Sequence, residues 1–259
     1  MRRLLLFVFA ITASLLVSSC LIVEQEITLK RNGSGIKTVQ IDLGEMISNP
    51  MMAMMSGDEG IPSEKKDSSW LMIDDLREHN PQWTSEEIAL LENARGEMSL
   101  DTDEGVMLIT MSTTFNSLDE LKRIERLIAD ANKPDEDDEE EGAGGMPDFS
   151  DFGNTGDDTE YEFTKKSLSL MTPVSEISEG VFGGLGLDEE DEGMEMLLGM
   201  LDGSKAVYKF NLPGKVKKVK GMEGAVIDGN TVTVEVGLME AIEDPEMSAA
   251  ALTGEIKFK

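Results

Sequence analysis

From Val23 onward, the chain alternates apolar and polar residues in the way that is typical of a half-buried β-strand. The dipeptide Asn32-Gly33 follows, the strongest short-range signal for a β-hairpin, and a second alternating segment runs to Leu43. The apolar side chains of the two segments that fall on one face are Val23, Ile27, Leu29, Val39, Ile41 and Leu43. The pattern predicts a β-hairpin with one buried face.

Helical spacing of apolar residues appears in three places between residues 70 and 131. The segment Trp70 to His79 presents Trp70, Ile73 and Leu76 on one stripe. Thr84 to Glu87 has the sequence of a capping box, and the flanking Trp83 and Ile88 are placed as a hydrophobic staple. We expect a helix in each of these segments.

A second capping box, Ser117 to Glu120, opens the third predicted helix. Its buried stripe consists of Leu121, Ile124, Ile128 and Ala131. Between the capping boxes, Val106 to Phe115 is rich in β-branched residues and predicts a strand.

The rest of the chain is again mostly β-like. Tyr161 to Met171 resembles a strand, whereas Met194, Leu197, Leu198 and Leu201 follow helical spacing. Three alternating apolar sets predict the C-terminal strands: Tyr208, Phe210 and Leu212; Val232, Val234 and Val236; Leu252, Ile256 and Phe258. Half-buried strands with helices between them favour an α+β fold with a mostly antiparallel sheet.

Residues 132–158 have the composition of an acidic, disordered linker. Asp135 to Glu141 is an unbroken acidic run, and glycines and further aspartates follow. A calcium site is the alternative, but the spacing lacks the fixed ligand positions of a calcium loop. We therefore expect residues 20–131 and 159–259 to form two parts of one α+β domain that the linker interrupts.

The first residues have the pattern of a lipoprotein signal peptide, residues 1–19. Arg2 and Arg3 precede an apolar run from Leu4 to Val17, which is too short to span a bilayer that needs about 20 apolar residues. The run ends in Val17-Ser18-Ser19-Cys20, which resembles the lipobox of bacterial lipoproteins. An ordinary secretory signal with a chance cysteine is the alternative.

Cys20 is the single cysteine of the chain, so its acylation, for example with palmitate, leaves no thiol for disulfides, catalysis or metal binding. Because several acyl chains anchor a protein stably, we expect a membrane-attached protein of the cell envelope. Leu21 stands where a retention signal would place aspartate. We therefore expect the outer membrane, facing the periplasm, if the host has one.

The formal net charge of −29 excludes some classes of partner. With 52 acidic against 23 basic side chains, the surface repels nucleic acid, and nucleic-acid binding is not expected.

Both ends of the mature chain contain turn-and-strand motifs of a known family. Glu26-Ile27-Thr28-Leu29 leads into Asn32-Gly33-Ser34-Gly35. Near the C-terminus, the segment from Tyr208 to Val216 ends in Pro213-Gly214-Lys215-Val216, and a hairpin motif runs from Asp228 to Thr233. Together with the lipobox, these segments resemble LppM-type lipoproteins. The resemblance implies an α+β lipoprotein domain of binding or envelope-associated type, without catalytic residues to carry over. The C-terminal membrane helix that is usual in that family has no counterpart before Lys259.

The sequence contains little that indicates a catalytic or cofactor-binding site. A Ser-His-Asp site would need His79, the single histidine, which is more simply a residue at a helix end. Zinc clusters lack ligands, and Gly183 to Gly186 lacks the lysine of a phosphate-binding loop. We expect no cofactor, no metal and no enzymatic activity.

Two candidate binding regions remain. Lys215, Lys217, Lys218 and Lys220 form a basic cluster that could contact an anionic ligand or lipid head groups. Lysines that protect a strand edge, or that pair with the acidic linker, are the alternatives. Met194, Met196 and Met200, like the methionines between 51 and 55, could line an adaptable apolar groove or belong to the core.

These observations predict a membrane-anchored, non-catalytic lipoprotein that binds a protein or lipid partner. A structural or assembly-accessory lipoprotein without a small ligand is the alternative. A hydrolase is a distant third hypothesis.

Overall fold

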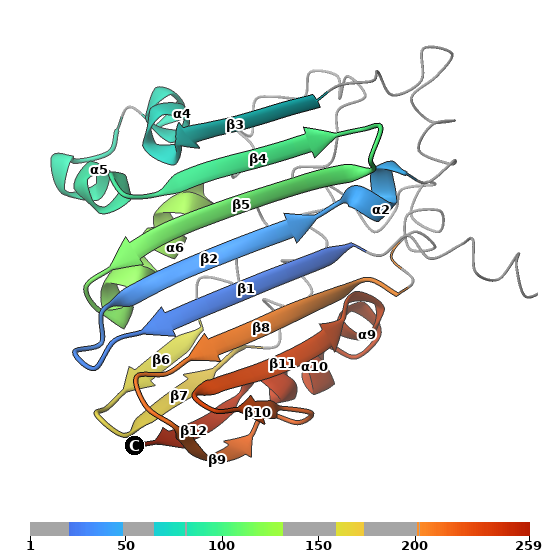
Figure 1. Ribbon diagram of the computed structural model, residues 1–259. Helices are drawn as coiled ribbons and strands as arrows, with labels where there is room; N and C mark the ends of the chain where they lie inside the picture. Colours follow the sequence, from blue (N-terminus) through green and yellow to red (C-terminus); the bar gives the residue numbers. More distant parts are fainter. Residues whose placement is uncertain (1–20, 49–64, 81, 132–158, 174–200, 202) are drawn as a thin grey trace, which may run out of the picture.

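The computed structural model describes residues 21–48, 65–80, 82–131, 159–173, 201 and 203–259. Two sheets organise this part of the chain (Figure 1). The larger has eight strands in the order β10-β11-β8-β1-β2-β5-β4-β3, and the smaller has four in the order β6-β7-β12-β9. The predicted α+β fold with mostly antiparallel sheets is confirmed.

The elements of the first half are β1 (Ile22–Leu29), β2 (Gly35–Asp42), α2 (Gly44–Ile47), β3 (Lys65–Leu71), α4 (Met72–His79), α5 (Ser85–Leu91), β4 (Arg95–Asp101), β5 (Val106–Phe115) and α6 (Leu118–Ala131). Those of the second half are β6 (Glu160–Phe163), β7 (Ser167–Met171), β8 (Lys205–Asn211), β9 (Val216–Gly221), β10 (Val226–Asp228), β11 (Thr231–Gly237), α9 (Leu238–Glu243), α10 (Pro245–Leu252) and β12 (Gly254–Phe258). Among the described residues, no helix is long and apolar enough to cross a membrane.

The predicted N-terminal hairpin is confirmed and forms the centre of the large sheet. Val23 pairs with Ile41 across β1 and β2, and Gly33 takes the positive φ of +85° that the turn requires. On its other side, β1 pairs in parallel with β8, so that Val23 lies opposite Ala206. The large sheet therefore joins residues from both halves of the chain.

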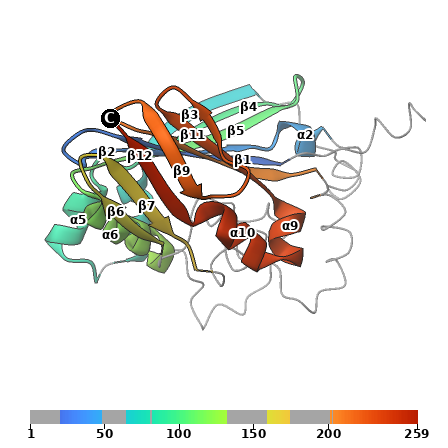
Figure 2. The same ribbon diagram turned by 90° about the horizontal axis from the view of Figure 1, so that it is seen from below.

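The small sheet and helices α5, α6, α9 and α10 lie on one face of the large sheet, as the edge-on view in Figure 2 shows, whereas α2 lies at the end of its strands. The inner face of the large sheet, α6 and the small sheet share one buried cluster, which includes Ile41, Leu121, Val234 and Ile256. The opposite face carries polar cross-strand contacts, such as Lys209 Nζ to Glu24 Oε2 at 2.6 Å. The molecule is thus layered, with its core between the two sheets and beneath the helices.

One buried ion pair interrupts this core. Lys37 on β2 points to Glu125 on α6, with 2.6 Å between Nζ and Oε1, and both side chains are 6% exposed. The pair ties α6 to the sheet at a point where neither charge reaches bulk water.

The predicted helix from Trp70 is wrong at its start. Trp70 belongs to strand β3 and lies opposite Gly96 of β4, whereas α4 begins at Met72. A Cβ atom on Gly96 would lie 2.2 Å from the Trp70 ring, so the missing side chain makes room for the indole. The spacing of Trp70, Ile73 and Leu76 fits a helix, but this cross-strand contact decides the conformation of Trp70.

The first predicted capping box is confirmed. Glu87 N donates to Thr84 Oγ1 at 3.3 Å, and Thr84 N donates to Glu87 Oε2 at 2.8 Å. In the second, Glu120 N donates to Ser117 Oγ, but the Glu120 carboxylate accepts hydrogen bonds from Asn116 Nδ2. In the helix that follows, Leu121 and Ile124 are buried as predicted, whereas Ile128 and Ala131 are only half-buried.

Two further predictions need correction. The single strand expected over Tyr161 to Met171 is a hairpin of β6 and β7, because Thr164 caps a turn and accepts from the backbone N–H of Ser167. Leu252 is buried with Ile256 and Phe258, but it ends helix α10 instead of belonging to strand β12. The predicted strand from Val106 to Phe115 is confirmed as β5.

Candidate ligand-binding crevice between the sheets

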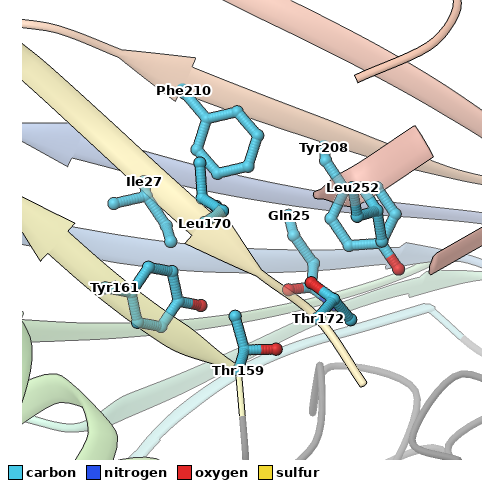
Figure 3. A pocket seen from close by; sticks show the side chains of 9 residues that line it. All are labelled: Gln25, Ile27, Thr159, Tyr161, Leu170, Thr172, Tyr208, Phe210 and Leu252. Carbon is cyan, nitrogen blue, oxygen red and sulfur yellow. The ribbon is translucent and has the colours of Figure 1, made fainter. Parts of the chain in front are cut away.

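A crevice lies between the two sheets, where the inner face of β1 and β8 meets β6, β7 and α10 (Figure 3). Its lining is half polar and half apolar, and none of the lining side chains carries a charge. The lining residues are Gln25, Ile27, Thr159, Tyr161, Leu170, Thr172, Tyr208, Phe210 and Leu252.

Alternation along β1 and β8 directs these side chains inward. Gln25 lies between Val23 and Ile27 on the buried face of β1 and is only 5% exposed. It pairs in register with Tyr208 of β8, whose side chain points to the same face. The apolar pattern of β1 thus contains one buried amide, and this polar break is the local signal of the crevice in the sequence.

Three polar side chains reach the crevice without a hydrogen-bond partner in the described part of the chain. They are the amide of Gln25, the hydroxyl of Thr172 and the phenol of Tyr208. Thr172 is 7% exposed. Its backbone N–H donates a hydrogen bond to Thr253 Oγ1 at 3.1 Å, but its hydroxyl has no such partner in the described part of the chain. The buried side-chain atoms without a partner in the described part of the chain are Thr113 Oγ1 and Ser248 Oγ, so the three groups at the crevice keep access to its space and offer hydrogen-bond donors and acceptors there.

Both sides of the crevice combine polar and apolar side chains. Figure 3 shows Gln25, Thr172 and Tyr208 on one side, with Leu252 beside Tyr208, and Ile27, Leu170 and Phe210 on the other, with Tyr161 near Ile27. The crevice holds about 300 Å³ of empty space when the part open to solvent is included, but only about 10 Å³ admits the centre of a water molecule. In this conformation it takes roughly one water, so a larger ligand requires the lining side chains to move apart.

Burial raises the pKa of Tyr208 to about 12, because loss of contact with water disfavours the charged phenolate. The phenol therefore stays neutral at physiological pH. A tyrosine in the unfolded chain ionises near pH 10, so the unfolded state releases its proton first. The stabilisation from neutral Tyr208 is complete below about pH 10 and is lost as the pH rises toward 12.

We expect ultraviolet absorbance of the phenolate to show a titration step near pH 12 that is missing in Tyr208→Phe. The same substitution should flatten the loss of stability between about pH 10 and 12. A wild-type protein whose phenols both ionise near pH 10 while it is still folded would show that Tyr208 is solvated.

The residues predicted to bind an anion lie elsewhere. Lys217, Lys218 and Lys220 are exposed on strand β9, Lys215 directly precedes it, and none of the four lines the crevice. Cys20, Met194, Met196 and Met200 lie outside the described residues, as do the methionines between 51 and 55, Gly183 to Gly186 and the predicted linker. His79 ends α4, as predicted.

Comparisons with known proteins find little similarity. No known family profile matches the chain, and no curated protein matches it. Among solved structures, the chain is similar to the folded domain of the Mycobacterium tuberculosis protein LppM, determined by NMR. The identity is 8%, the TM-score is 0.35, and the alignment covers 93% of this chain and 91% of that one. The relationship is weak and concerns the fold alone, so no residue role is transferred.

Proposed function

We propose that this chain is a lipid-anchored, non-catalytic binding protein of the bacterial cell envelope, and that the crevice between its sheets holds the ligand. The anchor is proposed from the sequence Val17-Ser18-Ser19-Cys20. The ligand site is proposed from the unused hydrogen-bonding groups of Gln25, Thr172 and Tyr208.

The unpaired amide of Gln25 carries this proposal. A fully buried polar group without a partner costs about 1–3 kcal/mol, and the Gln25 amide, which keeps access to the crevice, costs at most that much, so an apolar side chain of similar size should leave the stability equal or slightly higher. Gln25 occupies a position where the alternation of β1 calls for an apolar residue, between Val23 and Ile27. A ligand that accepts or donates a hydrogen bond at this point would account for a polar residue at a position that suits an apolar one.

The chemistry of the lining defines the class of ligand. The amide and the two hydroxyls are neutral, and Tyr208 stays protonated at physiological pH. Such groups bind carbonyl, ester or hydroxyl oxygens, whereas Ile27, Leu170 and Phe210 favour an alkyl chain. We therefore propose a slender neutral amphiphile, such as the ester or hydroxyl end of a lipid.

The small space for water leaves one alternative: a purely structural lipoprotein in which a single water joins the three polar groups. The two hypotheses differ in how Gln25→Met affects ligand-free protein. If no water network depends on the amide, the free energy of unfolding should stay equal or rise by about 1 kcal/mol. A structural water bridge predicts a loss of about 1–3 kcal/mol instead.

The ligand can be sought by extracting lipids from protein that has been purified from membranes and identifying them by mass spectrometry. We expect a neutral amphiphile in a fixed molar ratio, reduced at least about tenfold in the Gln25→Met/Tyr208→Phe variant, which loses two hydrogen bonds. Thr110→Val, on the open face of β5, is the matched control and should retain the lipid. Equal amounts of lipid in both variants would contradict the site.

The anchor is tested separately by Cys20→Ser. Without the thiol no acyl chain can be attached, so we expect the protein to move from the membrane to the soluble fraction and to lose a metabolically incorporated fatty-acid label. A serine variant that keeps the label would show that the lipid is attached elsewhere.

A further inference from the structure

The described basic side chains are unevenly distributed. Turns and strands far apart in the sequence bring ten exposed lysines and arginines to one end of the molecule, which we call the basic end. They are Lys30, Arg31, Lys165, Lys166, Lys215, Lys217, Lys218, Lys220, Lys257 and Lys259. Residues 159–173, 212–223 and 254–259 contain eight of them and only four glutamates, in a chain of net charge −29.

Backbone contacts show that these segments meet. Phe258 N donates to Lys166 O, and Lys259 N donates to Lys215 O, so the turn between β6 and β7, the start of β9 and the C-terminus lie together. The hairpin turn of β1 and β2 joins them, because a Cβ atom on Gly33 would lie 3.4 Å from the Phe163 ring. Figure 1 shows this hairpin turn and the C-terminus at the same end of the sheets.

The basic residues of this end are mostly unpaired within the described part of the chain. Lys257 contacts Glu255 at 3.4 Å, and the other nine have no ion pair there. Elsewhere, Lys65, Lys205 and Lys209 each have a carboxylate within 3.0 Å. Because charges are screened over about 8 Å at physiological salt, the basic side chains of this end outweigh the acidic ones near them within the described part of the chain.

Exposed aliphatic side chains lie beside the lysines. Val226 and Ile227 of β10 are 65% and 47% exposed, and Val216 N donates to Gly229 O, which joins β9 to the end of β10. Unpaired lysines next to exposed aliphatic residues fit the interface of an anionic bilayer, where cations meet phosphates and aliphatic tips enter the head-group layer.

The start of β1 fixes which way this end faces, if the proposed anchor at Cys20 holds. Leu21, the next residue, is 1% exposed, and its N–H donates to Ser204 Oγ at 2.9 Å. The lipid would therefore attach without a flexible spacer. Strand β1 then runs roughly 26 Å to the turn with Lys30, at about 3.3 Å for each of its eight residues.

We propose that the basic end docks on an anionic phospholipid bilayer other than the one that holds Cys20, so that the protein bridges two membrane surfaces. The docking proposal depends only on the residues of the basic end. The bridging proposal also depends on the proposed lipid anchor at Cys20. The crevice takes no part in it.

Docking is tested by co-sedimentation of the full-length Cys20→Ser protein with vesicles of phosphatidylglycerol mixed with phosphatidylcholine. We expect binding that weakens with salt and is absent on phosphatidylcholine alone. Replacing Lys215, Lys217, Lys218 and Lys220 with glutamine should reduce partitioning on the order of 1,000-fold, at about 1 kcal/mol per lysine near the surface. Ile227→Ser should weaken it further without changing the salt dependence.

The matched control replaces Lys66, Arg77, Arg95 and Lys122 with glutamine, which changes the net charge equally outside the basic end. Equal loss of binding in both quadruple variants would overturn the basic end as the docking surface. Binding to dextran sulfate but not to anionic vesicles would overturn the lipid as its partner.

Bridging is tested with acylated wild-type protein in neutral vesicles, which should capture anionic vesicles, whereas the Lys→Gln variant should not. Failure of capture despite vesicle binding by the Cys20→Ser protein would overturn only the bridging. Gln25→Met should change neither vesicle binding nor vesicle capture. A failure of the crevice hypothesis can therefore be told apart from a failure of the docking or bridging hypothesis.

Discussion

Glu125→Gln should lower the free energy of unfolding by about 3–5 kcal/mol, because it leaves the Lys37 ammonium buried without its counter-charge. Both side chains are 6% exposed, so water cannot replace the lost carboxylate without opening the contact between α6 and β2. Urea denaturation at neutral pH measures the effect.

The double variant Lys37→Met/Glu125→Leu separates the loss of the pair from the loss of one partner. Buried ion pairs gain little over apolar residues of similar volume, so the double variant should recover most of the stability. Arg123→Gln, which removes an exposed ion pair with Glu86, is the control and should change stability by less than about 1 kcal/mol. A Glu125→Gln protein within 1 kcal/mol of wild type would show that the pair is solvated.

Ile256→Ala should destabilise the protein by about 2–5 kcal/mol and do so in a single transition. Ile256 is fully buried in β12, the strand of the small sheet that pairs with both β7 and β9. Its side chain belongs to the same core cluster as Ile41 of the large sheet. Because the two sheets share this core, a cavity in one should weaken both.

The two tryptophans, Trp70 and Trp83, provide the readout. Trp70 lies on β3 at the far edge of the large sheet, and Trp83 precedes α5. Their fluorescence and the far-ultraviolet circular dichroism should report the same lowered midpoint, whereas Lys217→Ala, on the exposed face of β9, should leave it unchanged. Separate midpoints for the two signals would mean that the sheets unfold independently.

Local sequence patterns predicted two kinds of element: those held by contacts between near neighbours in the sequence, and strands with one buried face. The alternation of the β1–β2 hairpin, the turn at Asn32-Gly33 and the capping box at Thr84 each contain their own signal, and all three are confirmed. The basic cluster from Lys215 to Lys220 was visible for the same reason, since four of its lysines are close in sequence.

Contacts between distant residues were beyond those patterns. Trp70 fits a helical stripe, and only the facing Gly96 shows why it extends β3. Likewise, Lys166, Lys215 and Lys259 become neighbours only when β6–β7, β9 and the C-terminus pack together.

The crevice was missed because its polar residues come from four elements or their flanks and no two of them form a motif. Gln25 alone gave a signal, as a polar residue on the apolar face of a strand. One polar residue on an apolar face does not by itself indicate a binding site. It does so only together with Tyr208 and Thr172, which line the same crevice.

The most direct test of the proposed function is methyl NMR of the full-length Cys20→Ser protein during titration with monooctanoylglycerol, a slender neutral ester. The account predicts saturable shifts of the Ile27, Leu170 and Leu252 methyl signals, with those of Leu91 and Ile124 unchanged, and their loss in Gln25→Met/Tyr208→Phe. Shifts that do not saturate, or that spread equally to Leu91 and Ile124, would contradict a ligand site between the sheets.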